Sequence, residues 1–336
     1  MHFFNFLATV LAASAVSAHP GADIEAEILE TREQISQLEH RNLDHCTEIL
    51  KRDGVFQRGI ERRMATFERL RAERYLNGLA PRADPINTSH KSNKPYTLNT
   101  LASTIFASNT SCLLSPEVTE GPYYVTGEYI RSDLVENQPG VKLHLDILVL
   151  DTTTCKPVPN VFVEIWQTNS TGVYSGVVAN GNGNFADKTN NKKSWLRGAQ
   201  KTSADGVVEF GTIFPGHYTG RTTHIHTLVH TNAAAAQNNG TLIDTGASHV
   251  GQFFFDQSLI TIVERTSPYT SNKQTLTTNA QDGILKEQSK VGDPFINYVF
   301  LAGGDSVSAG LLGWISFGIN PKLSKTVKAA TKFTGN

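Results

Sequence analysis

The densest chemistry in the sequence lies in one short segment, Phe214-Pro-Gly-His-Tyr-Thr-Gly-Arg-Thr-Thr-His-Ile-His226. His224 and His226 are two residues apart on a predicted strand, so their side chains share one face, where two imidazoles can bind one metal ion. Tyr218 and Arg221 precede them in a glycine-containing loop, which brings a phenol and a fixed cation towards the same place. A His-x-His pair alone is more often an incidental pair of surface or core histidines.

A second tyrosine strengthens the interpretation as a metal site. Tyr174 ends a separate strand-and-turn segment that begins at Val163. A phenol has a pKa near 10, so only a strong Lewis acid such as iron(III) holds two phenolates at neutral pH. Zinc would recruit a carboxylate or thiolate, and copper more histidines. Two tyrosines with two histidines therefore indicate ferric iron.

Structural alternatives remain open for several of these residues. Tyr174 could be an aromatic residue at the rim of a strand end, and Arg221 a structural ion-pair donor. Trp166 is expected in the core. His217 and His230 are expected to be loop and surface residues and not ligands.

Four stretches of the chain resemble the intradiol ring-cleaving dioxygenases, a family that includes catechol, hydroxyquinol and protocatechuate dioxygenases. The resemblance covers roughly residues 112 to 265, and the chain looks closest to the secreted fungal branch. The stretches that carry it are Glu120-Gly-Pro-Tyr-Tyr124, Val163-Glu-Ile-Trp-Gln167 running to Gly172-Val-Tyr174, Pro215-Gly-His-Tyr218 with Arg221-Thr-Thr-His-Ile-His226, and Gly251-Gln-Phe-Phe-Phe255.

The resemblance implies one non-haem iron(III) per chain, with O2 opening a catechol-type ring between its two hydroxyl-bearing carbons to a muconate-type product. The implied substrates are therefore a small aromatic diol and O2, and no external reductant is needed. By similarity the metal ligands are Tyr174, Tyr218, His224 and His226. The implied catalytic residues are Arg221, Tyr218 and Gln252, and the implied substrate-binding residues are Gly121, Pro122 and Tyr123.

Two functions from other classes compete with this one. The first is a non-catalytic β-sandwich binding module that holds a sugar or a partner with tyrosine and tryptophan side chains. The second is a zinc hydrolase. A convergent set of tyrosines and histidines is not needed for binding sugars, which disfavours the first alternative.

The hydrophobic pattern predicts a mainly β fold, with a β-sandwich core in residues 112–336 and an N-terminal helical arm in residues 19–76. Period-two alternation and turn residues between the segments indicate short strands. A linker rich in Pro, Asn, Ser and Thr is expected from about residue 77 to 111, and the part after Pro268 has no assignment. The strand candidates are Val141–Leu150, Val161–Trp166, Val207–Phe210, Thr223–Val229 and Gln252–Phe255.

The arm is predicted to contain one amphipathic helix from Ala22 to Leu50 and a second from about Ile60 to Leu76, separated by Asp53-Gly54. Three alternatives are open: the helices pack on their own domain, they form a homodimer interface, or they belong to a processed segment. The apolar stripe that favours a dimer contains Ile24, Ile28, Ile35, Leu38 and Ile49.

The N-terminus predicts secretion. Phe3 to Val16 is an apolar run too short to span a bilayer, and small residues before Ala18 suit signal-peptide cleavage, so residues 1–18 are expected to be removed. A formal net charge of −1 gives no indication of a nucleic-acid partner, and no later segment is apolar enough for a membrane. Four sequons support the secretory route: Asn87, Asn109, Asn169 and Asn239.

The chain has three cysteines, none with the spacing of a thiolate metal site. In an oxidising compartment, one pair can form a disulfide. We expect Cys112 to pair with Cys155, because Cys112 precedes the Glu120-Gly-Pro segment and Cys155 lies in a turn between two predicted strands of the same β-core. Cys46 on the helical arm would then be free or pair between subunits.

Overall fold

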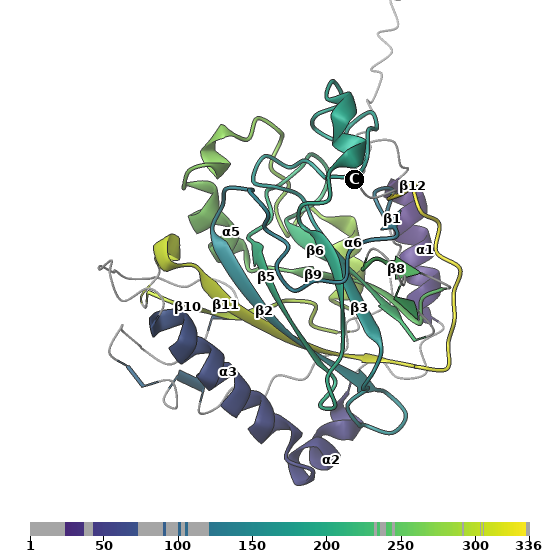
Figure 1. The fold of residues 1–336 in the computed structure, drawn as a ribbon, viewed down its shortest axis with the longest axis vertical. Coiled ribbons are helices and arrows are strands. Elements are labelled where there is room, and N and C mark those ends of the chain that lie inside the picture. The colour runs from purple at the N-terminus through teal and green to yellow at the C-terminus, as the bar shows by residue number, and fades with distance from the viewer. Residues whose placement is uncertain are drawn as a thin grey trace, which may run out of the picture.

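Two four-stranded sheets form the centre of the molecule in the computed structural model (Figure 1). The mainly β fold is therefore confirmed. The structure describes residues 24–36, 43–72, 90–91, 100–101, 105–106, 121–231, 234–235, 240–243, 246–290, 292–302, 304 and 306–333.

The first sheet has the order β10-β11-β2-β5, and a strand from the unassigned C-terminal part lies at its centre. β11 runs parallel to β2 over nine residue pairs, while the other pairings are antiparallel. The strands are β10 (Asn297–Phe300), β11 (Leu311–Ile319), β2 (Lys142–Asp151) and β5 (Val207–Ile213).

The second sheet has the order β4-β3-β6-β9 and is antiparallel throughout. Every residue of β6 and β9 is buried, so both faces of these strands are covered. The strands are β4 (Arg197–Lys201), β3 (Phe162–Trp166), β6 (His224–His230) and β9 (His249–Phe254). The five strand candidates from the sequence are confirmed as β2, β3, β5, β6 and β9, whereas β4, β10 and β11 were not predicted.

Short elements complete the described fold. β1 pairs in parallel with β12, which returns the C-terminal segment to the residues just after Tyr124, and β7 pairs with β8. Helices α5 and α6 follow β9. The bounds are β1 (Val125–Thr126), β12 (Thr331–Lys332), β7 (Ala234–Ala235), β8 (Leu242–Ile243), α5 (Gln257–Glu264) and α6 (Gly283–Gln288), with 3-10 turns at Lys188–Lys192, Tyr269–Ser271 and Val307–Ala309.

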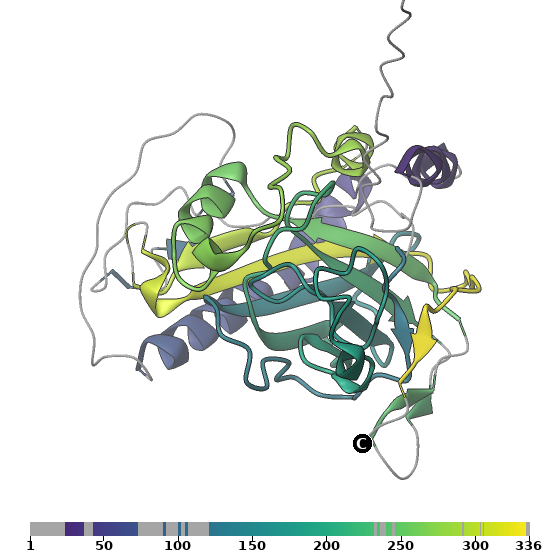
Figure 2. The same cartoon turned by 90° about the horizontal axis from the view of Figure 1, so that it is seen from above.

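Helix α3 (Val55–Ala72) packs along the first sheet (Figure 2). Phe67 and Leu70 lie in one buried cluster with Leu312 and Trp314 of β11. Arg62 forms a bidentate ion pair with Asp146 of β2, with N–O distances of 2.5 and 2.9 Å. This part of the arm thus packs on its own domain, and it begins at Val55, directly after the predicted break at Gly54, where φ is +67°.

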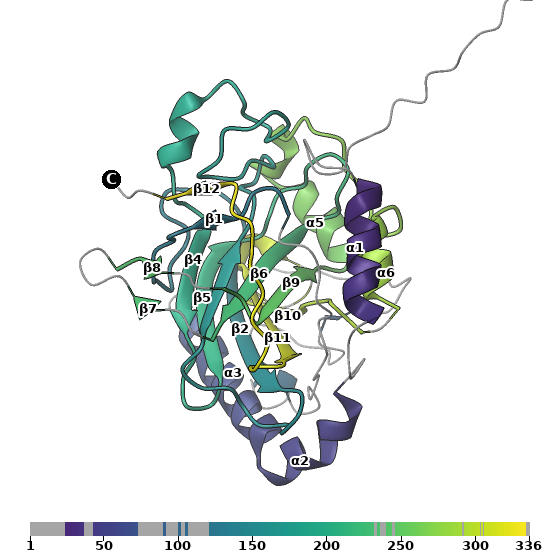
Figure 3. The ribbon, with the colours of Figure 1, turned by 90° about the vertical axis from the view of Figure 1, so that its right-hand side faces the viewer.

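Helix α1 (Ile24–Ser36) lies beside α6, on a different side of the molecule from α2 (Thr47–Arg52) (Figure 3). The prediction of one helix from Ala22 to Leu50 is wrong. The described residues form α1, then a 3-10 turn at Asp44–Cys46, then α2. The reason is burial: Leu43 and Leu50 pack with the end of β2, which turns this segment onto the sheets.

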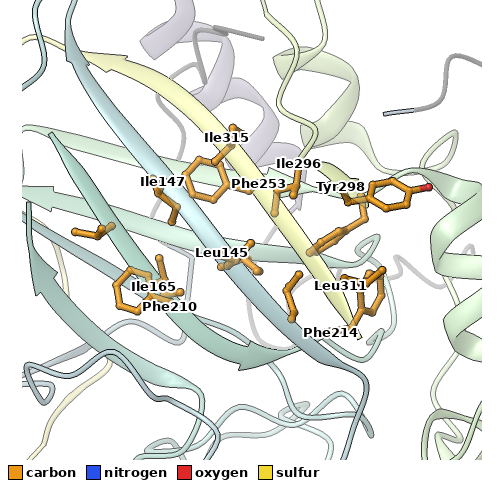
Figure 4. Close-up of a cluster of buried hydrophobic side chains, with 14 of the residues drawn as sticks. Leu145, Ile147, Ile165, Phe210, Phe214, Phe253, Ile296, Tyr298, Leu311 and Ile315 are labelled. Carbon is orange, nitrogen blue, oxygen red and sulfur yellow. The ribbon is translucent and has the colours of Figure 1, made fainter. Parts of the chain in front are cut away.

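The hydrophobic core lies between the two sheets (Figure 4). Leu145 and Ile147 of β2 meet Ile165 of β3 and Phe253 of β9, all at most 1% exposed. Burial of this apolar surface is the main favourable term in folding. The sheets therefore form a rigid base for the loops at their edges.

The disulfide joins Cys46 to Cys155, with a Cα–Cα distance of 5.1 Å. The predicted pairing of Cys112 with Cys155 is therefore wrong, as is a free or intersubunit Cys46. Both bonded cysteines are buried with Leu43 and Leu50, because α2 folds back onto the turn that follows β2. Cys112 lies outside the described residues.

The described parts of the predicted linker, residues 77–111, are anchored to the domain. His90 donates its backbone N–H to Asp256 (2.6 Å), and its carbonyl accepts from the N–H of Tyr298 (3.1 Å). Phe106 is fully buried between Phe67 and Trp314. These residues belong to the packed structure and not to a spacer.

Several predictions fall on residues that the structure leaves undescribed: the signal peptide, residues 1–18, and the sequons at Asn87, Asn109 and Asn239. Asn169 is described and half-buried. Its side-chain oxygen accepts from the N–H groups of Thr171 and Val173, and its amide donates to Gln138 (3.3 Å). None of the described helices has the length and apolarity to span a membrane.

Candidate metal centre

The central strand β6 positions the two histidines. His224 and His226 point to one face, and Ile225 between them lies in the core at 0% exposure. His226 pairs across the sheet with Trp166 on one side and Gln252 on the other. Trp166 stacks on the His226 imidazole, with ring centroids 4.8 Å apart and an interplanar angle of 5°. Trp166 is in the core as predicted, and it fixes the orientation of this imidazole.

Three of the four proposed ligands converge at their polar atoms. His224 Nε2 lies 3.1 Å from His226 Nε2 and 3.3 Å from Tyr218 Oη. On its other side, His224 Nδ1 lies 2.6 Å from the carbonyl oxygen of Thr222. That contact makes Nδ1 the protonated nitrogen and leaves the Nε2 lone pair facing the cluster, which is the arrangement of a metal-binding histidine.

Tyr174 reaches the same cluster from the loop after β3. Its ring centroid lies 5.6 Å from that of Tyr218 and 6.0 Å from that of His226. The backbone of Tyr174 is held on both sides: its N–H donates to Asn182 Oδ1, and its carbonyl accepts from the amides of Asn182 and Asn190, all at 2.8 Å. The structure therefore brings all four residues together.

The two asparagines were not predicted from the sequence. They lie in a loop from Ser175 to Leu196 that is rich in Asn, Gly and Lys. Both are buried, at 2% and 1% exposure. A side-chain amide can replace a neighbouring strand by offering both a donor and an acceptor to the backbone. Asparagine is so common in loops that the sequence does not distinguish these two hydrogen-bonding residues from others.

The two phenols are held in their neutral form by the protein alone. Burial raises the pKa of Tyr174 to about 12, against the opposing positive charges of Arg221 and Arg197. Burial and the neighbouring Tyr174 raise the pKa of Tyr218 well above its usual range. Tyr174 is 1% exposed, and its phenol interacts with the phenol of Tyr218. A buried phenol oxygen beside two imidazoles fits a hard, strongly Lewis-acidic ion such as iron(III).

Arg221 is fully buried and held in one orientation. Its Nε donates to Asp282 Oδ2 (2.8 Å), and one terminal nitrogen donates to Gln252 Oε1 (2.5 Å). Asp282 also caps α6 by accepting from the N–H of Leu285 (2.9 Å). Burial opposes the charge, but Asp282 and Tyr218 more than offset it, so the pKa of Arg221 lies above its ordinary value. The Arg221 guanidinium therefore stays positively charged.

Asp282 was not found from the sequence. It lies in the unassigned part after Pro268, 61 residues from the arginine that it holds. Its local signal was that of a helix N-cap, which many aspartates carry without any functional role. Gln252 was singled out, and its amide nitrogen is buried without a hydrogen-bond partner in the described structure.

The segment before β1 covers the cluster from another side. A Cβ on Gly121, where φ is +72°, would lie 3.0 Å from the His226 ring, so glycine permits this close approach. Tyr123 is 2% exposed, and its ring centroid lies 4.9 Å from that of Tyr174. Pro122 lies between them and is partly exposed. Gly121 thus lies against His226, and Tyr123 against Tyr174.

Arg197 connects these loops. Its guanidinium donates to the carbonyl oxygens of Ser175 (2.9 Å) and Tyr123 (2.8 Å) and to Glu128 (3.1 Å). Burial and the neighbouring carboxylate of Glu164 raise the pKa of Glu128 well above its usual range. Arg197 is a residue that the sequence reasoning missed, because nothing local distinguishes a buried arginine from an exposed one.

His217 lies in a loop as expected, but the expectation that His217 and His230 are surface residues is wrong. His230 is fully buried in β6, and its Nε2 lies 2.7 Å from Glu164. His217 is 5% exposed and contacts Glu264 at 2.8 Å. Buried histidines need such polar partners, which stabilise the loops around the cluster.

Several known proteins are similar to this chain in sequence and fold. A family model described as Dioxygenase matches residues 119–239. A curated catechol 1,2-dioxygenase 1 from Acinetobacter lwoffii is 34% identical over 109 residues, which are 31% of this chain and 32% of the relative. The matched region thus spans about a third of that relative's length.

Solved structures give a longer match. An intradiol ring-cleavage dioxygenase from Tetranychus urticae is 34% identical, with a TM-score of 0.51, and the alignment covers 64% of this chain and 98% of that one. A second solved dioxygenase is 35% identical with the same TM-score and the same coverage.

Proposed function

The chain belongs to the intradiol ring-cleavage dioxygenase family, a family of oxidoreductases, and we propose that it cleaves catechol-type rings with O2 at a single iron(III) centre. The bond between the two hydroxyl-bearing carbons breaks, and each carbon gains one oxygen atom from O2. The two hydroxyl protons leave, and the product is a muconate-type dicarboxylate. The two facing sheets serve as a β-sandwich base for the site.

The observation that carries this proposal is the convergence of Tyr174, Tyr218, His224 and His226. His224 Nε2 lies within 3.3 Å of both His226 Nε2 and Tyr218 Oη, and Tyr174 adds a buried phenol oxygen. Bound iron(III) would supply the Lewis acidity that ionises both phenols and the catechol hydroxyls. The residues present fit that ion.

The surrounding residues have separate roles. Arg221 presents a fixed positive charge in a buried setting, where it stabilises negative charge that develops on the ring. The side-chain N–H of Gln252 can donate a hydrogen bond to a substrate oxygen. Tyr218 Oη, once ionised, is a strong base because its surroundings favour the protonated phenol, so it can accept a catechol proton.

The alternatives find less support. A sugar-binding module needs exposed aromatic side chains, but among the described residues the exposed large hydrophobics include one aromatic, Phe185, whose ring lies under Lys188 Nζ at 3.6 Å. A zinc hydrolase would add a carboxylate or thiolate to the histidines. Within the described chain, no such group lies close enough to both His224 and His226 to share an ion.

We also propose that the protein is secreted. The apolar run from Phe3 to Val16 and the sequons support this, and the Cys46–Cys155 bond fits an oxidising compartment. Because the Asn169 side chain is engaged in hydrogen bonds, glycans are expected at the other sequons and not there. Glycopeptide mapping of the secreted protein tests both statements, and an intracellular, unglycosylated product would contradict them.

Dimerisation through the arm remains a proposal. Phe67 of α3 is buried against the chain's own sheet, whereas Leu29 of α1 is 61% exposed among the described residues and available to a second copy. Light scattering at micromolar concentration decides this. A dimeric wild type that becomes monomeric in Leu29→Lys supports the proposal, and a monomeric wild type contradicts it.

The proposed reaction is tested with oxygen-18 gas and unsubstituted catechol. We expect one O2 consumed per ring, with one labelled oxygen in each new carboxyl group by mass spectrometry. Oxygen derived from water, or product formation without O2 uptake, would rule out intradiol cleavage.

A further inference from the structure

Four ionisable side chains are buried together next to the loops of the candidate metal centre. Glu128, Glu164, Arg197 and His230 come from different parts of the chain, and each is at most 3% exposed. Burying a charged group is unfavourable unless hydrogen bonds or opposite charges compensate for the lost hydration. None of the four is among the proposed metal ligands, so metal binding does not explain why they are buried.

Arg197 is the member of this group that reaches the candidate site. Its Nε donates to the backbone carbonyl of Ser175, the residue after Tyr174, and its Nη2 donates to the carbonyl of Tyr123. A guanidinium is planar and presents its N–H groups in a fixed fork, so the two carbonyls cannot move apart while both bonds persist. The guanidinium carbon also lies 5.8 Å from the centre of the Tyr174 ring. Arg197 therefore sets the spacing between the Tyr123 segment and the Tyr174 loop.

Glu128 fixes the remaining end of the guanidinium, because its Oε1 accepts from Arg197 Nη1 at 3.1 Å. Glu128 Oε2 and Glu164 Oε1 are buried and receive no hydrogen bond from any other described group, but the two carboxyl groups form a hydrogen bond with one another. Such a bond requires a proton on one of them. Because burial and the charge of Glu164 raise the pKa of Glu128, the proton lies on Glu128. Neutral Glu128 thus accepts from Arg197 and donates to Glu164.

Glu164 is anchored in the second sheet. It lies on β3, and its Oε2 is 2.7 Å from Nε2 of His230 at the end of β6 and 3.5 Å from Tyr124 Oη. A continuous series of polar contacts therefore runs from the paired strands β3 and β6 through Glu164 and Glu128 to Arg197. Paired strands buried on both faces are rigid, so they can fix the position of the loops at the other end of this series.

We propose that Arg197 and Glu128 are positioning residues for the ring-cleavage reaction, with Glu128 in its neutral form. They hold Tyr123 against Tyr174, at a ring-centroid distance of 4.9 Å, and so fix the side of the site that Tyr123 offers to the catechol ring. The proposal rests on the ring-cleavage function proposed above. Without this connection, the Tyr123 segment and the Tyr174 loop can shift relative to one another. Such a shift changes ring binding and the orientation of the Tyr174 phenol, while the metal-binding atoms remain.

The first test uses iron-loaded full-length protein with catechol as substrate. Glu128→Gln keeps an acceptor for Arg197 and a donor for Glu164, so it should retain most of the wild-type kcat/KM. Glu128→Leu is similar in size but removes both bonds. We expect its kcat/KM to fall by about tenfold to a hundredfold, mainly through KM, because a small displacement of a positioned group is enough for such a loss. The phenolate-to-iron absorption band should shift, while the iron content changes little.

A second readout needs no metal. In the metal-free protein, amide hydrogen exchange should become faster in residues 121–124 and 174–176 of Glu128→Leu, because local opening of these segments is opposed less. Arg62→Lys is the matched control, since it alters a partly buried ion pair with Asp146 on the first sheet. It should lower the free energy of unfolding and leave KM, the absorption band and the exchange of these segments unchanged.

The outcomes separate the two proposals. Unchanged KM, absorption band and hydrogen exchange in Glu128→Leu would overturn the positioning role, while catechol cleavage stands. A loss of activity in Glu128→Gln as large as that in Glu128→Leu would overturn the neutral form of Glu128. Should Glu128→Leu fail to fold, Arg197→Lys decides by the same readouts, because a lysine cannot bond to Ser175, Tyr123 and Glu128 together. A wild type that neither binds nor cleaves catechol would overturn the proposed function and this inference with it.

Discussion

Tyr174 and Tyr218 occupy positions where the protein alone disfavours their ionised forms. Burial is the largest contribution to the raised pKa of each phenol. Phenolates at neutral pH would therefore depend on the energy of metal coordination, and metal uptake would release protons. The chemistry of the site is set by a few buried side chains.

Replacing Tyr174 by Phe removes one oxygen from the cluster and leaves the ring contacts in place. We expect iron affinity to fall by roughly a hundredfold or more, because even residues that only support a ligand cost 10–100-fold. Metal analysis after dialysis measures the loss. Tyr129→Phe, which removes a phenol outside the cluster, is the control. Full iron retention and activity in Tyr174→Phe would exclude Tyr174 as a ligand.

Replacing Arg221 by Lys keeps a charge but loses the planar group that contacts Asp282 and Gln252 together. Turnover should fall by about a hundredfold, as for other lost electrostatic groups, while iron content changes little. Steady-state kinetics with metal analysis separates the two effects, and Arg58→Lys at an exposed ion pair is the control. Unchanged turnover would remove Arg221 from the catalytic residues.

At the scale of elements, loops from distant parts of the chain are held by buried polar contacts. Asn182 forms a hydrogen bond with the backbone of Tyr174 in its loop. Arg197 links that loop by hydrogen bonds to the segment of Tyr123, and Asp282 links α6 to Arg221 by an ion pair. His90 does the same for the segment before the core, since its ring contacts Asp256 and Asp293. The contacts of His90 also make the stability depend on pH.

His90 gives a defined pH window. Although burial lowers it, hydrogen bonds to Asp256 and Asp293 raise the pKa of His90 from 6.5 to about 9. Because the pKa of His90 is higher in the folded state than in the unfolded state, protonated His90 stabilises the fold. This contribution to the free energy of unfolding is complete below about pH 6.5 and is lost as the pH rises through about 9. Denaturant unfolding of wild type and His90→Asn should differ by about 1–2 kcal/mol at pH 6 and little at pH 10. The exposed His45→Asn is the control, and a difference independent of pH would contradict the assignment.

The Cys46–Cys155 bond closes a loop of 109 residues between the arm and the core. In the loop-entropy account, its loss should cost about 2–4 kcal/mol of unfolding free energy, measured on the Cys46→Ser and Cys155→Ser double variant. Peptide mapping without reduction should identify the Cys46–Cys155 peptide. A Cys112–Cys155 peptide would contradict the structure.

How far the sequence predicted the fold depends on what covers each strand. β2 alternates along its first half, so its pattern was readable. β11 is buried along its whole length, because α3 covers one face and the core the other, and period-two alternation disappears. β4 reads Arg-Gly-Ala-Gln-Lys and has little strand propensity, so only its pairing with β3 makes it a strand.

The candidate site could likewise be predicted only in part. His224, His226 and Tyr218 are close in sequence, so their convergence could be predicted. Asp282 could not, because its partner is far along the chain. The cysteine pairing depended on whether the arm folds back onto the core, which its own amphipathic pattern left open.

In the molecule as a whole, the first and last described elements, α1 and β12, both lie near residues of the candidate site. Helix α1 docks beside α6 near Arg221, and β12 pairs with β1 immediately after Tyr124. Helix α3 covers the outer face of the first sheet and places its apolar side chains in the chain's own core. The two sheets therefore supply the rigid base, and α1 and β12 lie next to elements that carry candidate site residues.

Two tyrosines and two histidines of this chain are proposed to hold one ferric ion. The most direct measurement is an anaerobic titration of metal-free protein with iron(III), followed by visible absorption and pH-stat. We expect a charge-transfer band from phenolate to iron that saturates at one ion per chain, accompanied by proton release as the buried phenols ionise. Saturation without visible colour, or equal colour in a Tyr174→Phe, Tyr218→Phe double variant, would exclude the two tyrosines as iron ligands.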